Sequence, residues 1–501
     1  MNAADLFLGN AQRLAHKPAF FHAGGVVTHG EFAALAERAG NALAALPASP
    51  GNTVGVLMHD SPLAAAIIVG AMRAGLVPVP MNLRFASSDY LYIAEDCAAR
   101  AVIADPEFID LLAEVRAAGV RVIGSAEFTL AVDAAAAGGS SATVTEDTPA
   151  LRLYSSGTTG RPKGVIHSHR NVALSGTLLR EAVGAGEGSV VFSTSKFFFA
   201  YGLENTLLAP LAMGGASILI AAWPDAELVA ELAARHRPYC LLTMPTLYRR
   251  LLQLPVERFA PLRSITRFYT GGERLPDTLA QQWHAASGQE LHVGYGLTET
   301  LSNVSATFPG RNRVGGCIGE LLAGVECRLL ERGHSDGPEV APGEPGVLWV
   351  KHPSLALGYS DAAKTAETFR NGWLCTSDLC SRDADGFLYH HGRVDELIKV
   401  AGQWVKPLEV EETALADAQV REAACVVVPD GDGLERLALF IVPKSPGMGI
   451  DAARNRCAQE LPSHSRPKWI REIDELPRTG TGKIQRFKLR EALLEELRTK
   501  V

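Results

Sequence analysis

Short apolar runs alternate with helix-like segments along the first two thirds of this 501-residue chain. The runs at 53–58 and 101–104 are typical of buried strands, and the two segments between them, 62–75 and 88–97, have the pattern of helices. The same alternation predicts strands at 189–193, 216–220, 240–243 and 267–270, and helices at 205–213 and 246–254. Because strand–helix–strand units build parallel sheets covered by helices, we expect a layered α/β architecture.

The pattern changes after about residue 310, where glycine, proline and short strand-like runs such as 346–351 and 386–390 predominate. A smaller α+β pattern begins at residue 393. It predicts strands at 396–400, 423–428 and 438–442, a helix at 407–416 and a final charged helix. We therefore expect a large N-terminal domain of α/β layers with a small β-rich part, residues 1–394, and a small α+β C-terminal domain, residues 395–501.

Composition and charge narrow the classes of function. Apolar residues make up 47% of the chain and charged residues 21%, as in ordinary globular proteins. The net charge of -7 argues against a nucleic-acid partner. The first five residues carry an acid where a signal peptide has basic residues, and the apolar stretch 62–72 is too short to span a bilayer. We expect a cytoplasmic protein without a membrane partner.

Cysteine and histidine positions bear on metal binding. The eight cysteines are scattered without a Cys-x-x-Cys pair, which favours thiols in a reducing compartment, most of them buried. The pairs His167/His169 and His390/His391 have no second ligand cluster at zinc spacing, so we expect no zinc site.

The segment 154–164, Tyr-Ser-Ser-Gly-Thr-Thr-Gly-Arg-Pro-Lys-Gly, combines three glycines, four Ser/Thr hydroxyls and one lysine in eleven positions. Glycines let backbone amides approach an anion, hydroxyls donate to its oxygens, and a lysine adds a mobile positive charge. The segment is not the common nucleotide loop, because Lys163 is followed by Gly164 rather than Ser or Thr. It predicts a phosphate-binding loop, although an ordinary surface turn has a similar composition.

Five further segments carry chemically suited residues in a definite order. They are 270–276, 294–300, 373–378, 392–395 and 477–483. In the second of them Tyr295 is suited to stacking on a base and Thr298 to binding phosphate. Glu299 is suited to holding Mg²⁺ beside a triphosphate, or to capping the segment that follows. Asp378 and Arg393 are suited to ribose hydroxyls; a turn is the alternative role for Asp378.

The six segments, YSSGTTGRPKG, TGGERLP, YGLTET, TSD, GRVDELIK and RTGTGK, resemble in kind and order the adenylate-forming superfamily of acyl- and aryl-CoA synthetases. The match covers nearly the whole chain. The resemblance implies an acid–thiol ligase that uses ATP, Mg²⁺ and coenzyme A, with a mobile C-terminal domain that turns about a hinge at Asp395 between its two half-reactions.

The resemblance also implies a role for each motif residue. It implies that the ATP phosphates are bound by Ser155, Ser156, Gly157, Thr158, Thr159 and Lys163. The adenine falls to Gly272, Glu273 and Tyr295, the α-phosphate to Thr298, and Mg²⁺ to Glu299. The ribose falls to Asp378 and Arg393. Lys399 and Gly402 belong to the strand and turn that face the active site in thioester formation, although Lys399 alone also fits a solvated strand end.

The reaction needs the charges that these residues supply. Attack of a carboxylate on ATP brings anions together, and fixed positive charge and amide donors offset that repulsion. The resemblance identifies Lys483 as the catalytic lysine that bridges the carboxylate and the α-phosphate. The expected products are an acyl-adenylate and pyrophosphate, and a thiol then displaces AMP. We see no general base for that thiol.

The acid pocket is expected along 196–205, Lys-Phe-Phe-Phe-Ala-Tyr-Gly-Leu-Glu-Asn. This segment is similar to the benzoate–CoA ligase branch, whose pattern is close to Phe-Phe-Ala-Tyr-Gly-Leu-Gly-Asn. The resemblance assigns the acid to Phe199, Ala200, Tyr201, Gly296 and Ser302. An aromatic wall favours a planar aryl acid, whereas the alternative is that the phenylalanines are only core.

Two departures from the branch concern the ring of the acid. Glu204 stands where the branch tends to have glycine, and Ser302 stands where it has a histidine. A smaller side chain leaves room for a ring substituent, and a serine can hydrogen-bond a hydroxyl or amino group. We therefore expect a benzoate or substituted benzoate as substrate.

Three other functions stay open. An amino-acid-activating domain would need an acidic residue early in the pocket segment, and 197–201 has none. Transfer of an aryl or medium-chain acyl group to a carrier-protein thiol is a second alternative. A non-catalytic nucleotide-binding regulator is a third, which the presence of Lys483 disfavours. The oligomeric state is also open, with a homodimer as one alternative.

Overall fold

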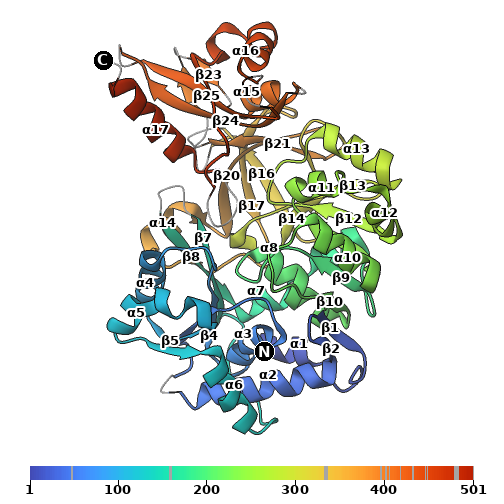
Figure 1. The fold of residues 1–501 in the computed structure, drawn as a ribbon. Coiled ribbons are helices and arrows are strands. Elements are labelled where there is room, and N and C mark those ends of the chain that lie inside the picture. Colours follow the sequence, from blue (N-terminus) through green and yellow to red (C-terminus); the bar gives the residue numbers. More distant parts are fainter. Residues whose placement is uncertain are drawn as a thin grey trace. The chain divides into compact units, whose positions relative to one another are not determined.

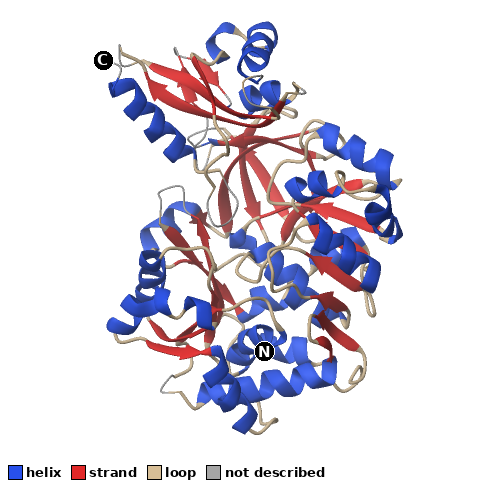
Figure 2. Cartoon of the chain, in the orientation of Figure 1, coloured by secondary structure: helices blue, strands red, loops and turns tan. Residues whose placement is uncertain are grey.

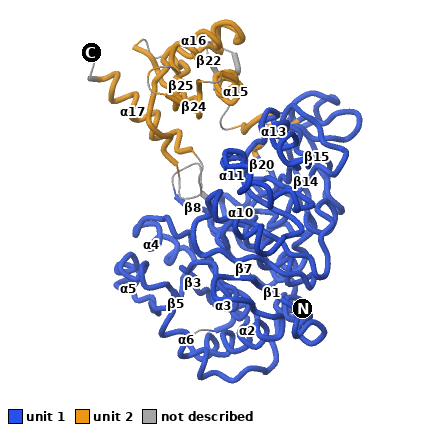
Figure 3. Tube along the Cα trace, turned by 45° about the vertical axis from the view of Figure 1, so that its right-hand side comes forward, with its two compact units in different colours: residues 1–376, 381–390 blue, residues 377–380, 391–501 orange. Residues whose placement is uncertain are grey.

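The computed structural model describes most of the chain. The described residues are 1–46, 49–156, 161–331, 337–394, 398–400, 403–405, 407–417, 419–431, 434–445, 447, 449–478 and 484–499. Two compact units are distinguished in Figure 3: unit 1 is Met1–Thr376 with Ser381–His390, and unit 2 is Ser377–Cys380 with His391–Val501. The predicted fold class, a large α/β part followed by a small α+β part, is confirmed. A domain boundary at 394/395 stays a prediction.

The first sheet of unit 1 has four parallel strands in the order β4-β3-β5-β6. Their bounds are β3 Thr53–Leu57, β4 Val77–Pro80, β5 Ala99–Ala104 and β6 Arg121–Gly124. Two of them, β4 and β5, are labelled in Figure 1. Alternate side chains of β5 enter different cores, because successive residues of a strand point to opposite faces. Ala101 and Ile103 lie in one core, Val102 and Ala104 in the other.

Helices cover both faces of this sheet. They are α2 His29–Ala44 and α3 Pro62–Arg73 in the first core, and α4 Ser87–Asp96 and α5 Ala113–Ala117 in the second. Apart from the exposed Arg100 and Arg121, the strands are therefore largely apolar, which is why the sequence shows apolar runs rather than alternation.

The second sheet of unit 1 carries most of the motif segments. Its parallel strands run in the order β1-β10-β9-β11-β12-β13, and β14 and β15 continue it antiparallel after β13. The bounds are β1 Pro18–His22, β9 Val190–Ser193, β10 Ala216–Ile218, β11 Cys240–Thr243, β12 Arg267–Thr270, β13 Leu291–Gly296, β14 Asn303–Ala306 and β15 Cys317–Leu321. The strands predicted at 240–243 and 267–270 coincide with β11 and β12.

A core centred on Trp283 packs helices against one face of that sheet. The helices are α10 Ala226–His236, α11 Pro245–Leu251 and α13 Asp277–Ser287. The Trp283 ring lies edge-on to Tyr248 and Phe268, with ring centroids 4.7 and 4.9 Å apart. Edge-to-face contacts of this kind add stabilisation beyond the buried area.

The glycine-rich segment 154–164 is built differently from the simple loop that its composition suggests. Strands β7 Pro149–Ser156 and β8 Pro162–Ser168 form an antiparallel pair in which Ser155 faces Lys163. A short strand, β18 Gly358–Tyr359, pairs with the other edge of β8. The expected loop is therefore, at both of its ends, part of a sheet. Residues 157–160 between the strands lie outside the described residues.

Unit 2 is a sheet with helices on both faces, as Figure 2 shows. Its main strands are β24 Val420–Pro429, β25 Glu435–Pro443 and β26 Trp469–Glu472. Helices α15 Pro407–Leu415 and α16 Gly449–Glu460 share one core, and α17 Arg486–Thr499 contributes to the other. The sequence did not predict α16, because only Gly449, Ala453 and Cys457 of that helix are buried and its apolar stripe is faint.

No helix within the described ranges combines the length and the apolar character that a bilayer crossing requires. Six of the eight cysteines are buried.

Candidate functional site

The phosphate segment and the acidic motif meet through a tyrosine that the sequence analysis did not single out. The Tyr359 hydroxyl donates a hydrogen bond to Glu299 Oε1 at 2.7 Å. Lys163 Nζ lies 5.8 Å from the centre of the Tyr359 ring. Strand β18 carries Tyr359 beside β8, which carries Lys163. Pairing of these two strands thus brings the lysine and the carboxylate close to the same tyrosine side chain.

The partner of Glu299 decides between its two predicted roles. Its carboxylate accepts from a side chain, Tyr359, rather than from a backbone amide of the next segment. Its own carbonyl oxygen accepts from the Ala356 amide at 2.8 Å. Capping is therefore not what the described contacts of Glu299 show, and the carboxylate stays suited to a cation beside phosphates.

Strand β8 also fixes Thr298, which begins the short helical turn Thr298–Thr300. His167 Nε2 lies 2.9 Å from the Thr298 carbonyl oxygen, so the neutral ring donates there. His167 is fully buried, and this burial lowers its pKa to about 4. Burial thus holds the imidazole uncharged at neutral pH, with its Nε2 against the backbone of the turn.

Close backbone approach explains two of the motif glycines. A Cβ on Gly296 would lie 3.0 Å from the Ser302 carbonyl oxygen and from Asn303 Cα, where the strands β13 and β14 meet. A Cβ on Gly271 would lie 2.9 Å from the Gly294 carbonyl oxygen and 3.4 Å from the Tyr201 ring. Gly296 thus lets β14 approach β13, and Gly271 lets the ends of β12 and β13 come together next to Tyr201.

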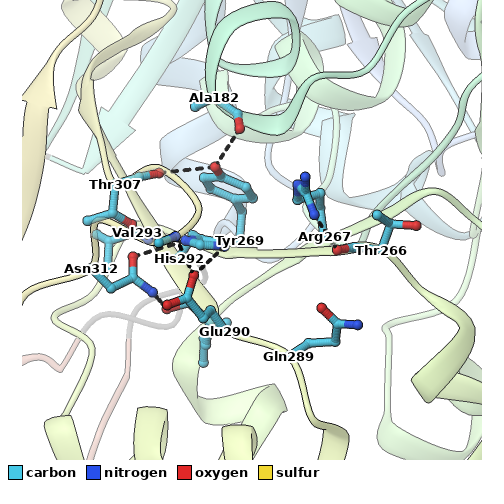
Figure 4. A network of polar contacts seen from close by, with 12 residues as sticks. Ala182, Thr266, Arg267, Tyr269, Gln289, Glu290, His292, Val293, Thr307 and Asn312 are labelled. Atoms are coloured by element: carbon cyan, nitrogen blue, oxygen red, sulfur yellow. Dashed lines mark hydrogen bonds and ion pairs between the residues drawn. The ribbon is translucent and has the colours of Figure 1, made fainter.

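A polar network connects β12 and β13 to neighbouring segments at residues that precede the motif ends of the strands (Figure 4). The Tyr269 hydroxyl lies 2.8 Å from the Ala182 carbonyl oxygen and 3.0 Å from that of Thr307. His292 Nδ1 lies 3.0 Å from Asn312 Oδ1, and burial lowers the pKa of this histidine. These contacts hold β12, which ends just before Gly271, and β13, which contains Tyr295, without using the motif side chains.

The predicted adenine residues lie at these strand ends. Gly272 has a positive φ of 80°, which favours glycine, and it is exposed beside half-buried Glu273. The Tyr295 ring is half-buried, with its centroid 6.2 Å from that of His390. The partly open faces of these residues are compatible with a flat ligand, and their role stays a prediction.

The aromatic segment divides between core and surface. Phe197 and Phe198 are 3% and 4% exposed and lie in two different cores, whereas Phe199, Ala200 and Tyr201 are only half-buried. The expectation of a wall made by three phenylalanines and a tyrosine is therefore wrong for the first two phenylalanines, which stabilise the fold. The three residues of this segment that are assigned to the acid are the ones that remain partly accessible.

A tight turn holds that segment. A Cβ on Gly202 would lie 2.2 Å from the Lys196 carbonyl oxygen, so only glycine fits. The Lys196 ammonium group is buried and donates to the carbonyl oxygens of Ile220, Ala221 and Ala222. The beginning of the segment is thus anchored on the loop after β10.

The two departures from the benzoate branch contact each other. The Ser302 hydroxyl donates to Glu204 Oε1 at 2.5 Å, and both side chains are buried. The sequence identified both positions but gave no sign that they pair, since they are 98 residues apart.

Unit 2 contains the two residues predicted for the ribose. Asp378 lies in strand β20 Trp373–Arg382, so its alternative role as a turn residue is wrong. The carboxylate is buried, with Oδ1 3.5 Å from Arg393 Nη1. Ser377, just before it, has a φ of 60°, a strained value for a residue with a side chain. Such strain is often found at functional positions.

Unit 2 also has a basic pocket of about 190 Å³ that the sequence did not indicate. Its lining residues are Arg436, Leu437, Ser463, His464, Arg466 and Lys468. Arg436 and Lys468 both bind the buried carboxylate of Asp430, at 3.0 and 2.9 Å. Three permanently charged side chains, Arg436, Arg466 and Lys468, thus line a pocket whose one paired carboxylate is Asp430, and the surplus of positive charge suits an anionic ligand.

Several predicted site residues lie outside the described residues. They are Gly157, Thr158, Thr159, Asp395, Gly402 and Lys483, and the side chains of Ser156 and Lys399 are likewise not described. Among the residues that are described, no three His, Cys, Asp or Glu side chains gather around a common metal position. Mg²⁺ usually needs only one or two carboxylates in addition to substrate phosphates and water, so Glu299 alone fits this cation.

Known proteins share the sequence and the fold of this chain. Residues 7–360 match the AMP-binding enzyme family, and residues 409–483 match the AMP-binding enzyme C-terminal domain. A 3-hydroxybenzoate–CoA/4-hydroxybenzoate–CoA ligase of Thauera aromatica is 39% identical over 98% of this chain and 97% of its own length. A 3-hydroxybenzoate–CoA ligase of an Aromatoleum species is 38% identical, with 98% and 97% covered.

The fold has a solved counterpart. The crystal structure of a benzoate CoA ligase from Burkholderia xenovorans LB400 superimposes with a TM-score of 0.89 and 33% identity, covering 98% of this chain and all of the other. The chain therefore belongs to the AMP-binding enzyme family, the adenylate-forming superfamily, within its benzoate–CoA ligase branch.

Proposed function

We propose that this protein is an AMP-forming aryl-CoA ligase that joins a benzoate-type acid to coenzyme A. In the first step a carboxylate oxygen attacks the α-phosphorus of ATP and pyrophosphate leaves. In the second step the CoA thiolate attacks the acyl carbon of the adenylate. The bond from the acyl carbon to the AMP oxygen breaks, and AMP leaves. The observation that carries the proposal is the convergence of Lys163, Tyr359 and Glu299 in unit 1.

The phosphate-binding role rests on charge and geometry. Lys163 supplies positive charge near the Tyr359 ring, and Glu299 supplies a carboxylate hydrogen-bonded to the Tyr359 hydroxyl. We assign Mg²⁺ to Glu299, with the cation neutralising phosphate charge when it is bound. Thr298, fixed through its carbonyl by His167, directs its hydroxyl to the α-phosphate. Ser155 and the residues that follow it in the segment donate to the other phosphates.

We assign the nucleoside to two sets of residues, one for the adenine and one for the ribose. Gly272, Glu273 and Tyr295 take the adenine. Asp378 and Arg393 take the ribose, for which a buried carboxylate next to a guanidinium offers both an acceptor and a donor. Lys483 provides the mobile charge for acid activation, with Asp395 as the hinge of the C-terminal domain.

For the second substrate, the basic pocket of unit 2 offers a place for phosphates. Coenzyme A carries a pyrophosphate and a further phosphate, and His464, Arg466 and Lys468 line a pocket suited to such groups. Lys399 and Gly402 belong to the segment that we assign to the pantetheine arm. We expect the thiol to react as thiolate.

The acid is assigned from the half-buried residues Phe199, Ala200 and Tyr201 together with Gly296 and Ser302. An aromatic and small-residue surface suits a planar ring. The names of the two hydroxybenzoate–CoA ligases at 39% and 38% identity support a ring-substituted benzoate rather than a fatty acid. Such a substrate points to aromatic acid metabolism in the cytoplasm.

The test is acid-dependent ATP–pyrophosphate exchange. The panel comprises benzoate, hydroxybenzoates, aminobenzoates, cinnamate, octanoate and a mixed amino-acid pool, each with and without coenzyme A. We expect exchange with aryl acids and AMP release that depends on coenzyme A. Equal or better turnover of octanoate would overturn the substrate class, exchange without use of coenzyme A would favour a carrier protein, and no exchange at all would favour a regulator.

A further inference from the structure

Glu204 is a buried carboxylate in the wall of the proposed acid pocket. It lies in the helical turn Leu203–Leu208, directly after the segment 199–201, and its residue is 1% exposed. Its Oε1 accepts two hydrogen bonds, from the Ser302 hydroxyl at 2.5 Å and from the Gly176 amide at 2.7 Å. Among the described residues no donor reaches the second oxygen, Oε2.

This carboxylate is not explained by the stability of the fold. The described part of the chain gives Glu204 no ion pair, and the cation that acts on it, Arg180, donates instead to the Ser175 carbonyl oxygen at 3.2 Å. Burial raises the pKa of Glu204 to about 7. Burying a carboxyl group without a full set of partners is costly, so glycine or an apolar residue would serve the core better.

Among the described residues, buried polar atoms without a hydrogen-bond partner also occur in the segment that contains Glu204. The Tyr201 hydroxyl is buried and has no hydrogen-bond partner among the described residues, and the Asn205 Oδ1 and Thr206 Oγ1 atoms are in the same condition. These side chains come from the segment that contains Glu204. Buried polar groups in native proteins are nearly always paired, so several unpaired ones together indicate a place that a ligand completes.

The Glu204–Ser302 hydrogen bond also joins the two segments to which the acid is assigned. Tyr201 lies three residues before Glu204, with its ring against Gly271. Gly296 lies close to the Ser302 backbone: a Cβ on Gly296 would lie 3.0 Å from the Ser302 carbonyl oxygen. The pair therefore closes the pocket wall between residues 199–201 and residues 296–302.

We infer that Glu204, held by Ser302, determines specificity by accepting a hydrogen bond from a hydroxyl or amino group on the ring of the acid. The inference rests on the proposed aryl-CoA ligase function. A phenolic hydroxyl has an ordinary pKa near 10 and is therefore a donor at neutral pH, which is what a carboxylate oxygen requires. An unsubstituted ring would leave the carboxylate without that donor.

The experiment compares hydroxybenzoates with fluorobenzoates of the same ring position, because fluorine occupies space without donating. kcat/KM is measured by ATP–pyrophosphate exchange for the 2-, 3- and 4-isomers and for benzoate. We expect the full-length enzyme to favour its best hydroxybenzoate over the matching fluorobenzoate by at least about tenfold, since sites that bind a hydroxyl reject analogues without one.

Two variants separate recognition from folding. Glu204→Met removes the acceptor at similar volume and should abolish the preference for the hydroxybenzoate over the matching fluorobenzoate. Glu204→Gln still has an acceptor oxygen and should retain part of this preference. Ser302→Ala should reduce the preference several-fold. Glu181→Gln is the control, because that carboxylate accepts from the Ala323 amide and belongs to no motif, and the preference should not change.

The outcomes distinguish the inference from the proposed function. A parent enzyme that exchanges aryl acids without favouring a hydroxyl, or a preference unchanged in Glu204→Met and Ser302→Ala, would overturn the inference alone. If Glu204→Met does not fold, the hydroxyl preference of the parent enzyme and its change in Ser302→Ala still test the inference. Absence of exchange with every aryl acid would overturn both.

Discussion

At the scale of single residues, the site depends on partners that are remote in sequence. Glu299 has the right chemistry and position in its motif, but its orientation comes from Tyr359, 60 residues away. A hydrogen bond to a charged group contributes more than one between neutral groups. Tyr359 is therefore a positioning residue, which keeps the carboxylate of Glu299 in place next to Lys163.

Tyr359→Phe removes that hydrogen bond and keeps the ring. We expect kcat/KM for acid-dependent exchange to fall about tenfold, about 1.4 kcal/mol, and the Mg²⁺ concentration for half-maximal rate to rise. A Mg²⁺ titration of both enzymes measures this. Tyr239→Phe is the control, since it removes a hydroxyl that donates to the Val183 carbonyl oxygen at 3.3 Å. An unchanged Mg²⁺ requirement in Tyr359→Phe would contradict the positioning role.

The sequence identified the chemically suited residues, because glycines, hydroxyls and charges at set spacings are visible in one dimension. It did not reveal Tyr359 or the Glu204–Ser302 pair. Tyr359 lies in an ordinary-looking segment, and its role depends on the pairing of β18 with β8. Pairing of this kind is a property of the folded chain and leaves no local pattern.

At the scale of secondary-structure elements, strand β8 links the phosphate segment to the motif of β13. Its residue Lys163 lies near Tyr359, and its residue His167 donates to Thr298. A buried neutral histidine makes this link sensitive to acid. Because the pKa of His167 is lowered to about 4, the unfolded chain binds a proton at higher pH than the folded one.

The sign of the pH effect follows. Between pH 6.5 and 4, protonation of His167 favours the unfolded state. The free energy of unfolding therefore decreases as the pH falls, by up to about 1.4 kcal/mol per pH unit. His167→Gln keeps a donor for Thr298 and cannot titrate. We expect the difference in unfolding free energy between parent and variant to change with this slope in urea denaturation.

His284, exposed on α13, provides the control, and His284→Gln should follow the parent at every pH. A parent–variant difference for His167→Gln that stays constant from pH 7 to 5 would show that His167 does not stay neutral in the fold.

The success of sequence-based prediction also varied by element. Strands β11 and β12 were predicted to the residue because buried parallel strands are continuous apolar runs. The segment 154–164 is predicted to be a loop, because glycine, serine and threonine are typical of turns, but its two ends belong to strands β7 and β8. Helix α16 was missed because few of its residues are buried. Elements whose residues are selected for ligand contact or exposure carry the weakest periodic signal.

At the scale of the whole molecule, the proposed reaction needs both compact units. Unit 1 contains the phosphate and acid residues, and the C-terminal part of the chain contains Lys483. The proposal that the C-terminal domain turns about Asp395 predicts that this lysine serves only one of the two half-reactions.

Lys483→Ala should slow adenylation at least about 10²-fold, roughly 2.7 kcal/mol of lost transition-state stabilisation. Thioester formation from preformed aryl-adenylate and coenzyme A should be largely unaffected. Single-turnover measurements of each step provide the comparison. Lys488→Ala, which removes an exposed lysine of α17, should leave both steps unchanged. Equal loss of both steps in Lys483→Ala would argue against a turning domain.

The most direct test of the account is to incubate the purified protein with ATP, Mg²⁺, coenzyme A and a hydroxybenzoate, and to quantify aroyl-CoA and AMP by mass spectrometry. The account predicts that the two products form in equal amounts and that neither forms when the acid is omitted. AMP formed without aroyl-CoA, or no turnover of any benzoate, would contradict it.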